Sequence, residues 1–167
     1  MSESGREPLR IGILGAARIT ERSLVAPARA GGHRLVAVAA RDRSRAEAFA
    51  EAHGVERVLG SYAELLADPE VEVVYNPLAN GLHGPWNLAA LAAGKHVLSE
   101  KPSASNAAEA VEVREAAATS GAVFMEAFHY LFHPVTRRLH ELLASGEPGE
   151  LRHVEAMVAI PAPEATD

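Results

Sequence analysis

The feature that most constrains this chain is a regular alternation of short, mostly apolar segments with longer stretches of helical spacing. The apolar segments have the length of strands, and their nearly continuous apolar character is typical of strands covered on both faces. They span residues 9–14, 34–40, 71–75, 96–99 and 122–125. Strands that alternate with helices predict a doubly wound α/β fold, a parallel sheet with helices on both faces.

The stretches between these strands carry helix start and stop signals. Gly54 and Gly121 stand where helices end, and Ser61 with Glu64 forms a capping box. Pro85 is expected in the first turn of its helix, where a missing N–H costs nothing. The predicted helices span residues 19–30, 44–53, 61–67, 86–93, 106–119 and 134–144.

Composition excludes several classes of protein. A chain of 167 residues fits one compact domain, and with no cysteine it has neither disulfides nor thiolate metal sites. The formal charge of −6 argues against a broad nucleic-acid-binding surface. The apolar segments are too short to cross a membrane, and residues 1–10 lack the apolar core of a signal peptide. A cytoplasmic protein without membrane or nucleic-acid partners is expected.

The last apolar stretch, at 149–160, breaks the alternation because prolines and not a helix follow it. It is predicted to be a strand. Two placements are open for it: the sixth strand of the sheet, or the first strand of a second domain.

The turn after the first strand offers a site for an anion. A dinucleotide-binding G-x-G-x-x-G turn needs glycines for the bend, for close approach to the diphosphate and for helix packing. These places hold Gly15, Ala17 and Thr20, so only the first is met. The turn nevertheless opens the first helix, whose backbone N–H groups and dipole attract phosphate.

The end of the second predicted strand indicates which dinucleotide is bound. NAD enzymes place a carboxylate about 20 residues after the glycine turn to hold the ribose. Here Ala40 and Arg41 stand at that point, with Arg43 and Arg45 close behind. A guanidinium pairs with a 2′-phosphate, which favours NADP over NAD. Two alternatives stay open: Arg41 only starts a solvated helix, or Asp42 turns toward the ribose.

Lys101 stands within Glu100-Lys101-Pro102, directly after the fourth predicted strand. Ligands of open parallel sheets bind at the carboxyl ends of strands. A lysine that is desolvated there can move a proton, which arginine cannot. Glu100 is placed to hold either the lysine or a cofactor hydroxyl. Lys101 is the candidate catalytic residue.

Several blocks of sequence resemble the Gfo/Idh/MocA oxidoreductases, which include glucose-fructose oxidoreductase, inositol dehydrogenases and dimeric dihydrodiol dehydrogenases. The blocks are RIGILGAARI at the first turn, NGLH at 80–83, AALAAGKHVLSEKP at 89–102 and MEAFHYLFHP at 125–134. The resemblance extends from residue 9 to about residue 160, and the EKP block is its most specific part.

The resemblance implies an N-terminal Rossmann domain and a C-terminal mixed-sheet domain that covers the nicotinamide and forms the oligomer interface. Residues 1–8 are then a flexible tail, 9–147 the dinucleotide-binding domain and 148–167 the beginning of a substrate and oligomerisation domain that this chain does not contain. A homo-oligomer is expected for a full-length protein. The lysine that matches Lys101 lies beside the carbon that exchanges hydride, and further catalytic residues come from the second domain.

The loops and the resemblance together give the candidate cofactor-binding residues. They are Gly15, Ala17, Arg18, Ile19, Arg41, Leu78, Ala79, Asn80, His83, Glu100 and Lys101. His83 is interpreted as a loop residue near the nicotinamide. No metal is expected, because His129 and His133 have the wrong order for a zinc motif and Pro134 places the helix after them. Trp86 and Phe128 are interpreted as core or cleft wall.

These observations give one leading hypothesis and two alternatives. The leading hypothesis is an NADP(H)-dependent dehydrogenase, with NAD as a possible cofactor, that acts on a hydroxyl-bearing, carbohydrate-like substrate such as a sugar, polyol or diol. The first alternative is a non-catalytic NADP-binding sensor or docking module. The second, a methyltransferase, would usually have an acidic residue where Ala40 stands.

Overall fold

The computed structural model describes residues 7–159, and the chain divides into two compact units. The first ends at Ala127 and the second begins at Phe128. The predicted boundary after residue 147 places the last helix in the first domain, and it stays a prediction. Most of the predicted tail at 1–8 lies outside the described residues.

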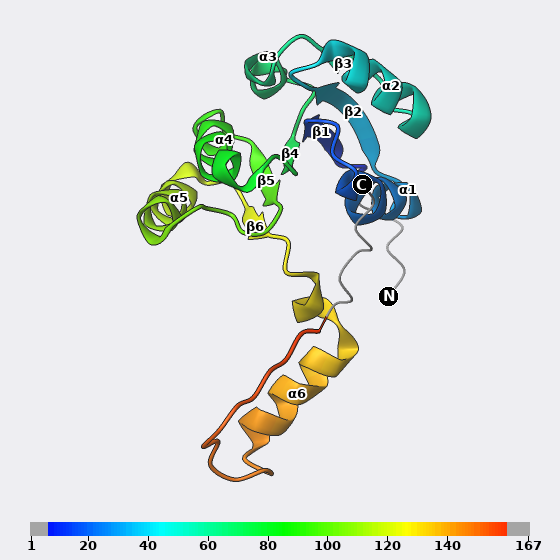
Figure 1. The fold of residues 1–167 in the computed structure, drawn as a ribbon. Helices are drawn as coiled ribbons and strands as arrows, with labels where there is room; N and C mark the ends of the chain where they lie inside the picture. Colours follow the sequence, from blue (N-terminus) through cyan, green and yellow to red (C-terminus); the bar gives the residue numbers. More distant parts are fainter. Residues whose placement is uncertain (1–6, 160–167) are drawn as a thin grey trace, which may run out of the picture. The chain divides into compact units, whose positions relative to one another are not determined.

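The first unit is built on a six-stranded sheet in the order β3-β2-β1-β4-β5-β6 (Figure 1). Every pairing is parallel, so the doubly wound prediction is confirmed. The strands are β1 Arg10–Leu14, β2 Arg34–Ala39, β3 Val58–Leu59, β4 Val73–Asn76, β5 His96–Ser99 and β6 Phe124–Glu126. The strand order reverses between β1 and β4, and ligands of such sheets bind at the carboxyl ends beside that reversal.

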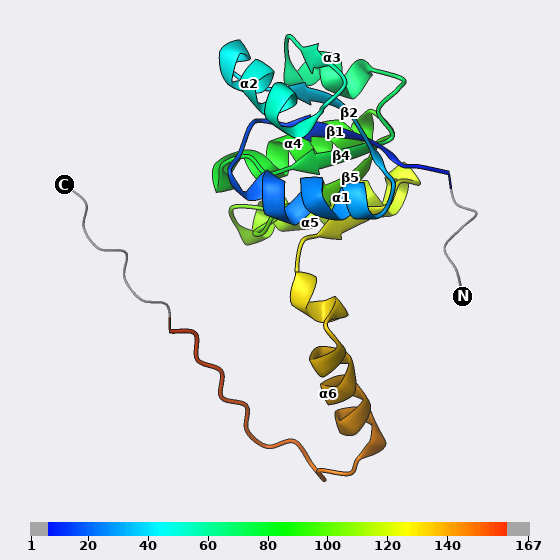
Figure 2. The ribbon, with the colours of Figure 1, turned by 90° about the vertical axis from the view of Figure 1, so that its right-hand side faces the viewer.

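Helices cover both faces of this sheet (Figure 2). They are the π-helical turn η1 Glu21–Val25, α1 Ala26–Ala30, α2 Arg43–His53, α3 Tyr62–Ala67, α4 Asn80–Ala92 and α5 Ala107–Ser120. Apolar residues of η1, α1 and α2 pack on one face, and those of α3, α4 and α5 pack on the other.

The central strands β1, β2 and β4 are largely buried on both faces, as their apolar sequences predict. Ile11 and Ile13 pack beneath α1 and α2, and Leu14 packs on the opposite face. Gly12 sits where a Cβ would lie 2.9 Å from both Leu65 Cδ2 and Val71 Cγ1. A side chain at position 12 would therefore push α3 away from the sheet.

The capping signals in the sequence correspond to real caps. The Ser61 hydroxyl accepts from the Glu64 amide at 3.1 Å, and the Asn106 side chain caps α5. The return bond of the capping box differs, because the Glu64 carboxylate accepts from the Gly60 amide instead of that of Ser61. Gly54 ends α2 in the left-handed conformation.

The predicted helix at 19–30 forms, with a wide π-helical turn at its centre. Pro27 gives the physical reason, because it cannot donate to the carbonyl four residues earlier and its ring crowds that carbonyl. The widened turn relieves this crowding.

The prediction that Pro85 opens its helix is wrong. Helix α4 begins at Asn80 and holds Pro85 in its interior. The bond that Pro85 cannot make would reach Gly81, in the exposed first turn of the helix. Water can serve that carbonyl, so the helix tolerates the proline.

Strand β3 is missing from the sequence prediction because it is only two residues long. It pairs with β2 through Val38↔Val58 and Ala39↔Leu59. A segment this short carries no measurable periodicity. The strands predicted at 71–75 and 122–125 form with their bounds moved toward the C-terminus.

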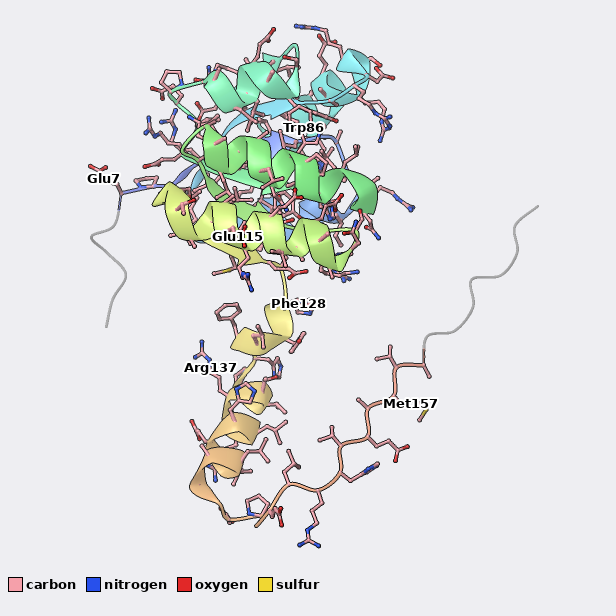
Figure 3. The ribbon with its side chains drawn as sticks, turned by 90° about the vertical axis from the view of Figure 1, so that its left-hand side faces the viewer. Glu7, Trp86, Glu115, Phe128, Arg137 and Met157 are labelled. Atoms are coloured by element: carbon pink, nitrogen blue, oxygen red, sulfur yellow. The ribbon has the colours of Figure 1, made fainter. Side chains whose placement is uncertain are left out.

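The second unit contains the short 3-10 helix η2 His129–Phe132 and the helix α6 Pro134–Ser145. The helix predicted at 134–144 is thus confirmed, and His133 caps it by accepting from the Val135 amide. The strand predicted at 149–160 is wrong over its described residues, which form no strand up to residue 159. A strand needs a partner for its backbone groups, and the side chains of Val154 and Met157 are exposed here; Met157 is labelled in Figure 3. Ile160 lies outside the described residues.

Candidate functional site

A cleft of about 450 Å³ lies at the carboxyl edge of the sheet, beside the reversal of strand order. The loops that follow β1, β2 and β4 line it, together with residues of α2, α3 and α4. The lining residues are Gly15, Ala16, Ala17, Ala40, Arg41, Asp42, Arg45, Tyr62, Pro77, Leu78, Ala79 and Leu82.

Gly15 makes the bend that opens the cleft floor. Its φ of +83° lies in the left-handed region, and its amide donates to the Ala39 carbonyl at 2.6 Å. A Cβ there would lie 2.9 Å from Leu78 Cδ2, on the opposite wall. Glycine is therefore required for both the backbone conformation and the space. Ala17, in place of the second glycine, also lines the cleft.

The helix that begins at Ile19 directs its first N–H groups toward this bend. Thr20, in place of the third glycine, is fully buried, and its amide donates to the Ala17 carbonyl at 3.1 Å. Its Oγ1 has no hydrogen-bond partner among the described residues. Threonine thus packs where the third glycine would allow helix and strand to approach.

Two arginines after β2 line the cleft. Arg41 lies two residues after the strand, and Arg45 reaches back from α2 so that its Nη2 donates to the Ala16 carbonyl at 3.2 Å. Arg43 is not among the lining residues, and its Nε donates to Glu47 Oε1 at 2.8 Å. The sequence predicted Arg41 as the contact and pointed to Arg45 only as a neighbouring arginine, because nothing local shows that Arg45 turns back to bond Ala16.

The carboxylate of Asp42 is committed to capping α2. It accepts from the amide of Ser44 at 2.9 Å, from the Ser44 hydroxyl at 2.7 Å and from the Arg45 amide at 3.4 Å. The Ser44 hydroxyl, followed by the Arg45 amide, holds the pKa of Asp42 below its ordinary value. This acid therefore serves the helix N-terminus, although it also borders the cleft.

A smaller hollow adjoins the cleft at the end of β2. It shares Arg41 and Tyr62 with the cleft and adds Trp86 from α4. The Tyr62 and Trp86 rings meet edge to face, with centroids 4.9 Å apart. Trp86 is therefore a wall residue, as predicted. Phe128 belongs to the second unit, where its ring packs against Tyr130.

The loop after β5 carries Lys101, whose side chain is exposed and lies outside the cleft lining. The peptide bond from Lys101 to Pro102 is cis. Glu100 Oε1 accepts from the Tyr75 hydroxyl at 2.8 Å, and Oε2 accepts from the Lys101 amide at 3.4 Å. Burial, and then the Glu100 carboxylate, raises the pKa of Tyr75. Tyr75 therefore remains a hydrogen-bond donor to Glu100 at all ordinary pH values.

Buried amides fasten this loop to the sheet and to α4. Asn76 Nδ2 donates to Asn87 Oδ1 at 2.8 Å, and Asn87 Nδ2 donates to Ser99 Oγ and to the Ser103 carbonyl. Both asparagines are fully buried. Neither asparagine was predicted from the sequence, although an asparagine inside an apolar helix face is a signal for Asn87.

His83 is a helix residue, so its interpretation as a loop residue is wrong. It lies in α4 and is 1% exposed. Its Nε2 lies 2.7 Å from the Leu78 carbonyl, and its Nδ1 lies 2.6 Å from the Pro102 carbonyl. Both ring nitrogens are therefore occupied by the chain itself. Direct contact of His83 with a cofactor stays a prediction.

The structure brings some of the candidate cofactor-binding residues together in the cleft, namely Gly15, Ala17, Arg41, Leu78 and Ala79. The others lie on neighbouring segments and do not line it. Arg18 and Ile19 begin the first helix, Asn80 begins α4, His83 is inside α4, and Glu100 and Lys101 follow β5.

Within residues 7–159, no group of three or more His, Asp or Glu side chains is arranged to hold a metal ion. No helix within these residues has both the length and the apolar character needed to span a membrane.

The chain was compared with known proteins. Residues 9–128 match the family model GFO_IDH_MocA, described as "Oxidoreductase family, NAD-binding Rossmann fold". The chain is 42% identical over 159 residues to D-xylose 1-dehydrogenase (NADP(+)) 2 of Haloferax volcanii, which covers 95% of this chain and 49% of that protein. It is 47% identical over 124 residues to trans-1,2-dihydrobenzene-1,2-diol dehydrogenase of Bos taurus, covering 74% of this chain and 37% of the relative.

A solved structure shares the fold. KijD10, a 3-ketoreductase from Actinomadura kijaniata in complex with NADP and TDP-benzene, superimposes with a TM-score of 0.72 at 36% identity. The match covers 84% of this chain and 43% of KijD10, so this chain spans about half the length of its relatives or less. The parallel sheet, the glycine bend and the family match lead to one conclusion: the chain belongs to the GFO_IDH_MocA family of oxidoreductases with an NAD-binding Rossmann fold.

Proposed function

We propose that this chain is the cofactor domain of an NADP(H)-dependent dehydrogenase that acts on a sugar, polyol or diol. The observation that carries the proposal is the cleft at the carboxyl edge, with Gly15 at its floor and Arg41 and Arg45 at one end. Asp42, the one carboxylate among the lining residues, is engaged in a helix cap and leaves the arginines to face a 2′-phosphate.

The residues of the cleft fit a dinucleotide. The side-chain-free bend at Gly15 lets the backbone approach a diphosphate, and the helix that begins at Ile19 supplies N–H groups and a favourable dipole. Arg41 and Arg45 are positioned to bind the 2′-phosphate, with Tyr62 and Trp86 as neighbouring aromatic surface. When bound, the nicotinamide of NADP(H) accepts or supplies the hydride.

Lys101 is proposed to move or polarise the proton of the substrate hydroxyl. Its loop is held by Glu100, which Tyr75 orients, and by the buried bonds of Asn87. An ammonium group can release a proton to a developing alkoxide and take it back in the reverse direction. Its exposure in this chain leaves it accessible to a substrate.

The names of the relatives support the substrate class. One is an NADP(+)-dependent D-xylose dehydrogenase, one is a diol dehydrogenase, and KijD10 is a 3-ketoreductase in complex with NADP. Their greater length supports the further proposal that residues 148–167 open a mixed-sheet domain that supplies the remaining catalytic residues and a homo-oligomer interface. A cytoplasmic location is proposed with it.

Cofactor choice is tested by titrating NADPH and NADH into the wild-type chain and into Arg41→Ala and Arg45→Ala. Each substitution removes a charge-assisted bond to the 2′-phosphate and is expected to weaken NADPH binding by about tenfold, with NADH binding unchanged. Arg43→Ala is the matched control, because Arg43 pairs with Glu47 and lies outside the cleft lining. An unchanged ratio of affinities in both cleft variants refutes the assignment.

Catalysis is tested on the whole gene product with NADP⁺ and a panel of sugars, polyols and diols. Turnover that is lost in Lys101→Met is the expected result. NADPH binding without turnover on any member of the panel would instead identify a cofactor-binding sensor or docking module.

A further inference from the structure

The imidazole of His83 lies between two loops that leave the carboxyl edge of the sheet. Leu78, whose carbonyl faces Nε2, belongs to the loop after β4 that lines the cleft. Pro102, whose carbonyl faces Nδ1, directly follows Lys101. One buried ring therefore joins the cleft wall to the loop of the proposed catalytic lysine.

The chemistry of this bridge is directional. A carbonyl oxygen only accepts hydrogen bonds, so each contact needs an N–H on the ring. A neutral imidazole has one N–H and bonds one of the two carbonyls, whereas an imidazolium has two and bonds both. The two ring nitrogens lie 2.6 and 2.7 Å from the two carbonyl oxygens, so the ring contacts both loops and, when it carries both protons, donates to both.

The surroundings of His83 hold its ring in place. The His83 carbonyl accepts from Asn76 Nδ2 at 3.2 Å, which fixes the backbone of this turn of α4. At the next residue, Gly84, a Cβ would lie 2.8 Å from Glu109 Oε2, so α5 packs closely against α4 there. His83 is 1% exposed, so its ring is enclosed by the chain.

We propose that His83 is a positioning residue that fixes the distance between the cleft wall at Leu78 and the loop of Lys101. The inference rests on the proposed function. If the chain binds NADP(H) as proposed, the bridge sets where the nicotinamide half lies relative to Lys101. On the proposed function the adenosine half lies at the end of β2, which β1 separates from β4, so its binding is not expected to depend on the bridge.

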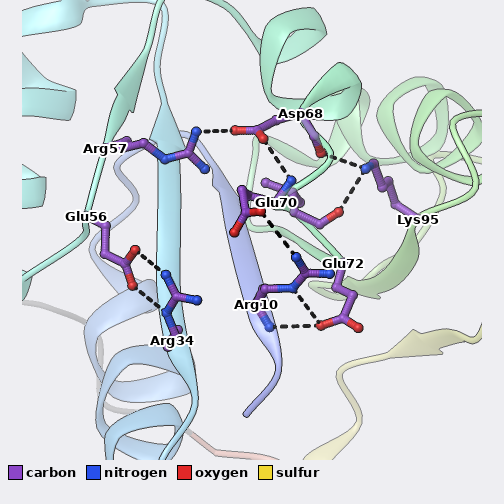
Figure 4. Close-up of polar contacts among 9 residues, drawn as sticks. Arg10, Arg34, Glu56, Arg57, Asp68, Glu70, Glu72 and Lys95 are labelled. Carbon is purple, nitrogen blue, oxygen red and sulfur yellow. Dashed lines mark hydrogen bonds and ion pairs between the residues drawn. The ribbon is translucent and has the colours of Figure 1, made fainter. Parts of the chain in front are cut away.

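The chain offers a matched control at the opposite edge of the sheet. The Nζ of Lys95 also bonds two backbone carbonyls, those of Asp68 and Val71, each at 2.8 Å (Figure 4). Lys95 precedes β5, whereas Lys101 follows it. Lys95→Met thus breaks a comparable bridge without reaching the cleft.

The experiment compares two ligands on the wild type, His83→Leu, His83→Gln and Lys95→Met. NADPH contains the nicotinamide, whereas adenosine 2′,5′-bisphosphate contains only the adenosine and 2′-phosphate half. His83→Leu is expected to weaken NADPH by about tenfold, to change the fluorescence of the bound nicotinamide and to leave adenosine 2′,5′-bisphosphate unchanged. His83→Gln keeps one donor nitrogen, which can reach one of the two carbonyls. Its NADPH affinity is expected to lie between those of His83→Leu and the wild type. Lys95→Met is expected to bind both ligands as the wild type does.

The outcomes separate this inference from the proposed function. If the wild type fails to bind NADPH, the proposed function is wrong. If the wild type binds NADPH and both His83 variants match it, the bridge does not position the nicotinamide. Equal loss of both ligands, or unfolding of both His83 variants by circular dichroism, would assign His83 a purely structural role and overturn the inference.

Discussion

Substitution of Gly15 by alanine separates the two demands that the structure places on this residue. At φ +83° an alanine occupies the left-handed region, which costs about 1–2 kcal/mol. Alanine also restricts the unfolded chain more than glycine does, which raises the free energy of unfolding by about 0.4–1 kcal/mol. The new Cβ also lies 2.9 Å from Leu78 Cδ2, the flexible end of a cleft side chain. We therefore expect about 1 kcal/mol of lost stability, and a floor that holds the diphosphate less closely.

The control is Gly121→Ala. Gly121 has a similar φ of +71°, and nothing lies within 4 Å of a Cβ built there. Urea denaturation should show a loss of stability from backbone strain in both variants, and Gly15→Ala should lose at least as much as Gly121→Ala because it also carries the contact with Leu78. NADPH titration should differ: about tenfold weaker binding in Gly15→Ala and wild-type binding in Gly121→Ala. Wild-type NADPH affinity in Gly15→Ala would refute the idea that the diphosphate rests on this bend.

Two further predictions concern stability. Tyr75→Phe keeps the ring and removes the hydroxyl that donates to Glu100 at 2.8 Å. The free energy of unfolding, measured by urea denaturation, should fall by about 1.5 kcal/mol. An unchanged denaturation midpoint would show that Glu100 is held by other groups. At the amino edge of the sheet (Figure 4), the side chain of Arg34 lowers the pKa of Glu56, and the backbone amide of Arg10 lowers that of Glu72. Their contribution is present above the ordinary pKa of 4.5 and is lost as pH falls through the lower folded values. The double variant Glu56→Gln, Glu72→Gln should therefore be less stable at neutral pH and lose less stability on acidification. The test is to measure denaturation midpoints of the wild type and the double variant across pH. If both lose stability equally as the pH falls, the prediction is contradicted.

The architecture was accessible from sequence because the central strands are buried on both faces and most helices begin or end at a readable signal. Ser61, Asn106, Gly54 and Gly121 each mark a helix end through local chemistry that needs no tertiary context. The limits were also physical. Strand β3 is defined only by its pairing with β2, and the helix around Pro85 begins earlier because an exposed Gly81 carbonyl tolerates a missing donor.

The candidate site was predicted where a residue acts through its backbone or its place after a strand, as at Gly15 and Arg41. It was missed where the role depends on a neighbour distant in sequence. Arg45 enters the cleft by bonding Ala16, and His83 becomes a bridge only because the loops of Leu78 and Pro102 meet at its ring. The segment beyond residue 150 was misread because an apolar sequence predicts a strand, whereas a strand forms only against a partner.

The most direct test of the account is a crystal structure of the chain grown with excess NADPH. We expect the diphosphate over residues 15–17, the 2′-phosphate against Arg41 and Arg45, and the nicotinamide beside the loops that His83 joins, within reach of Lys101. A nucleotide bound elsewhere, or one whose nicotinamide points away from Lys101, would contradict it.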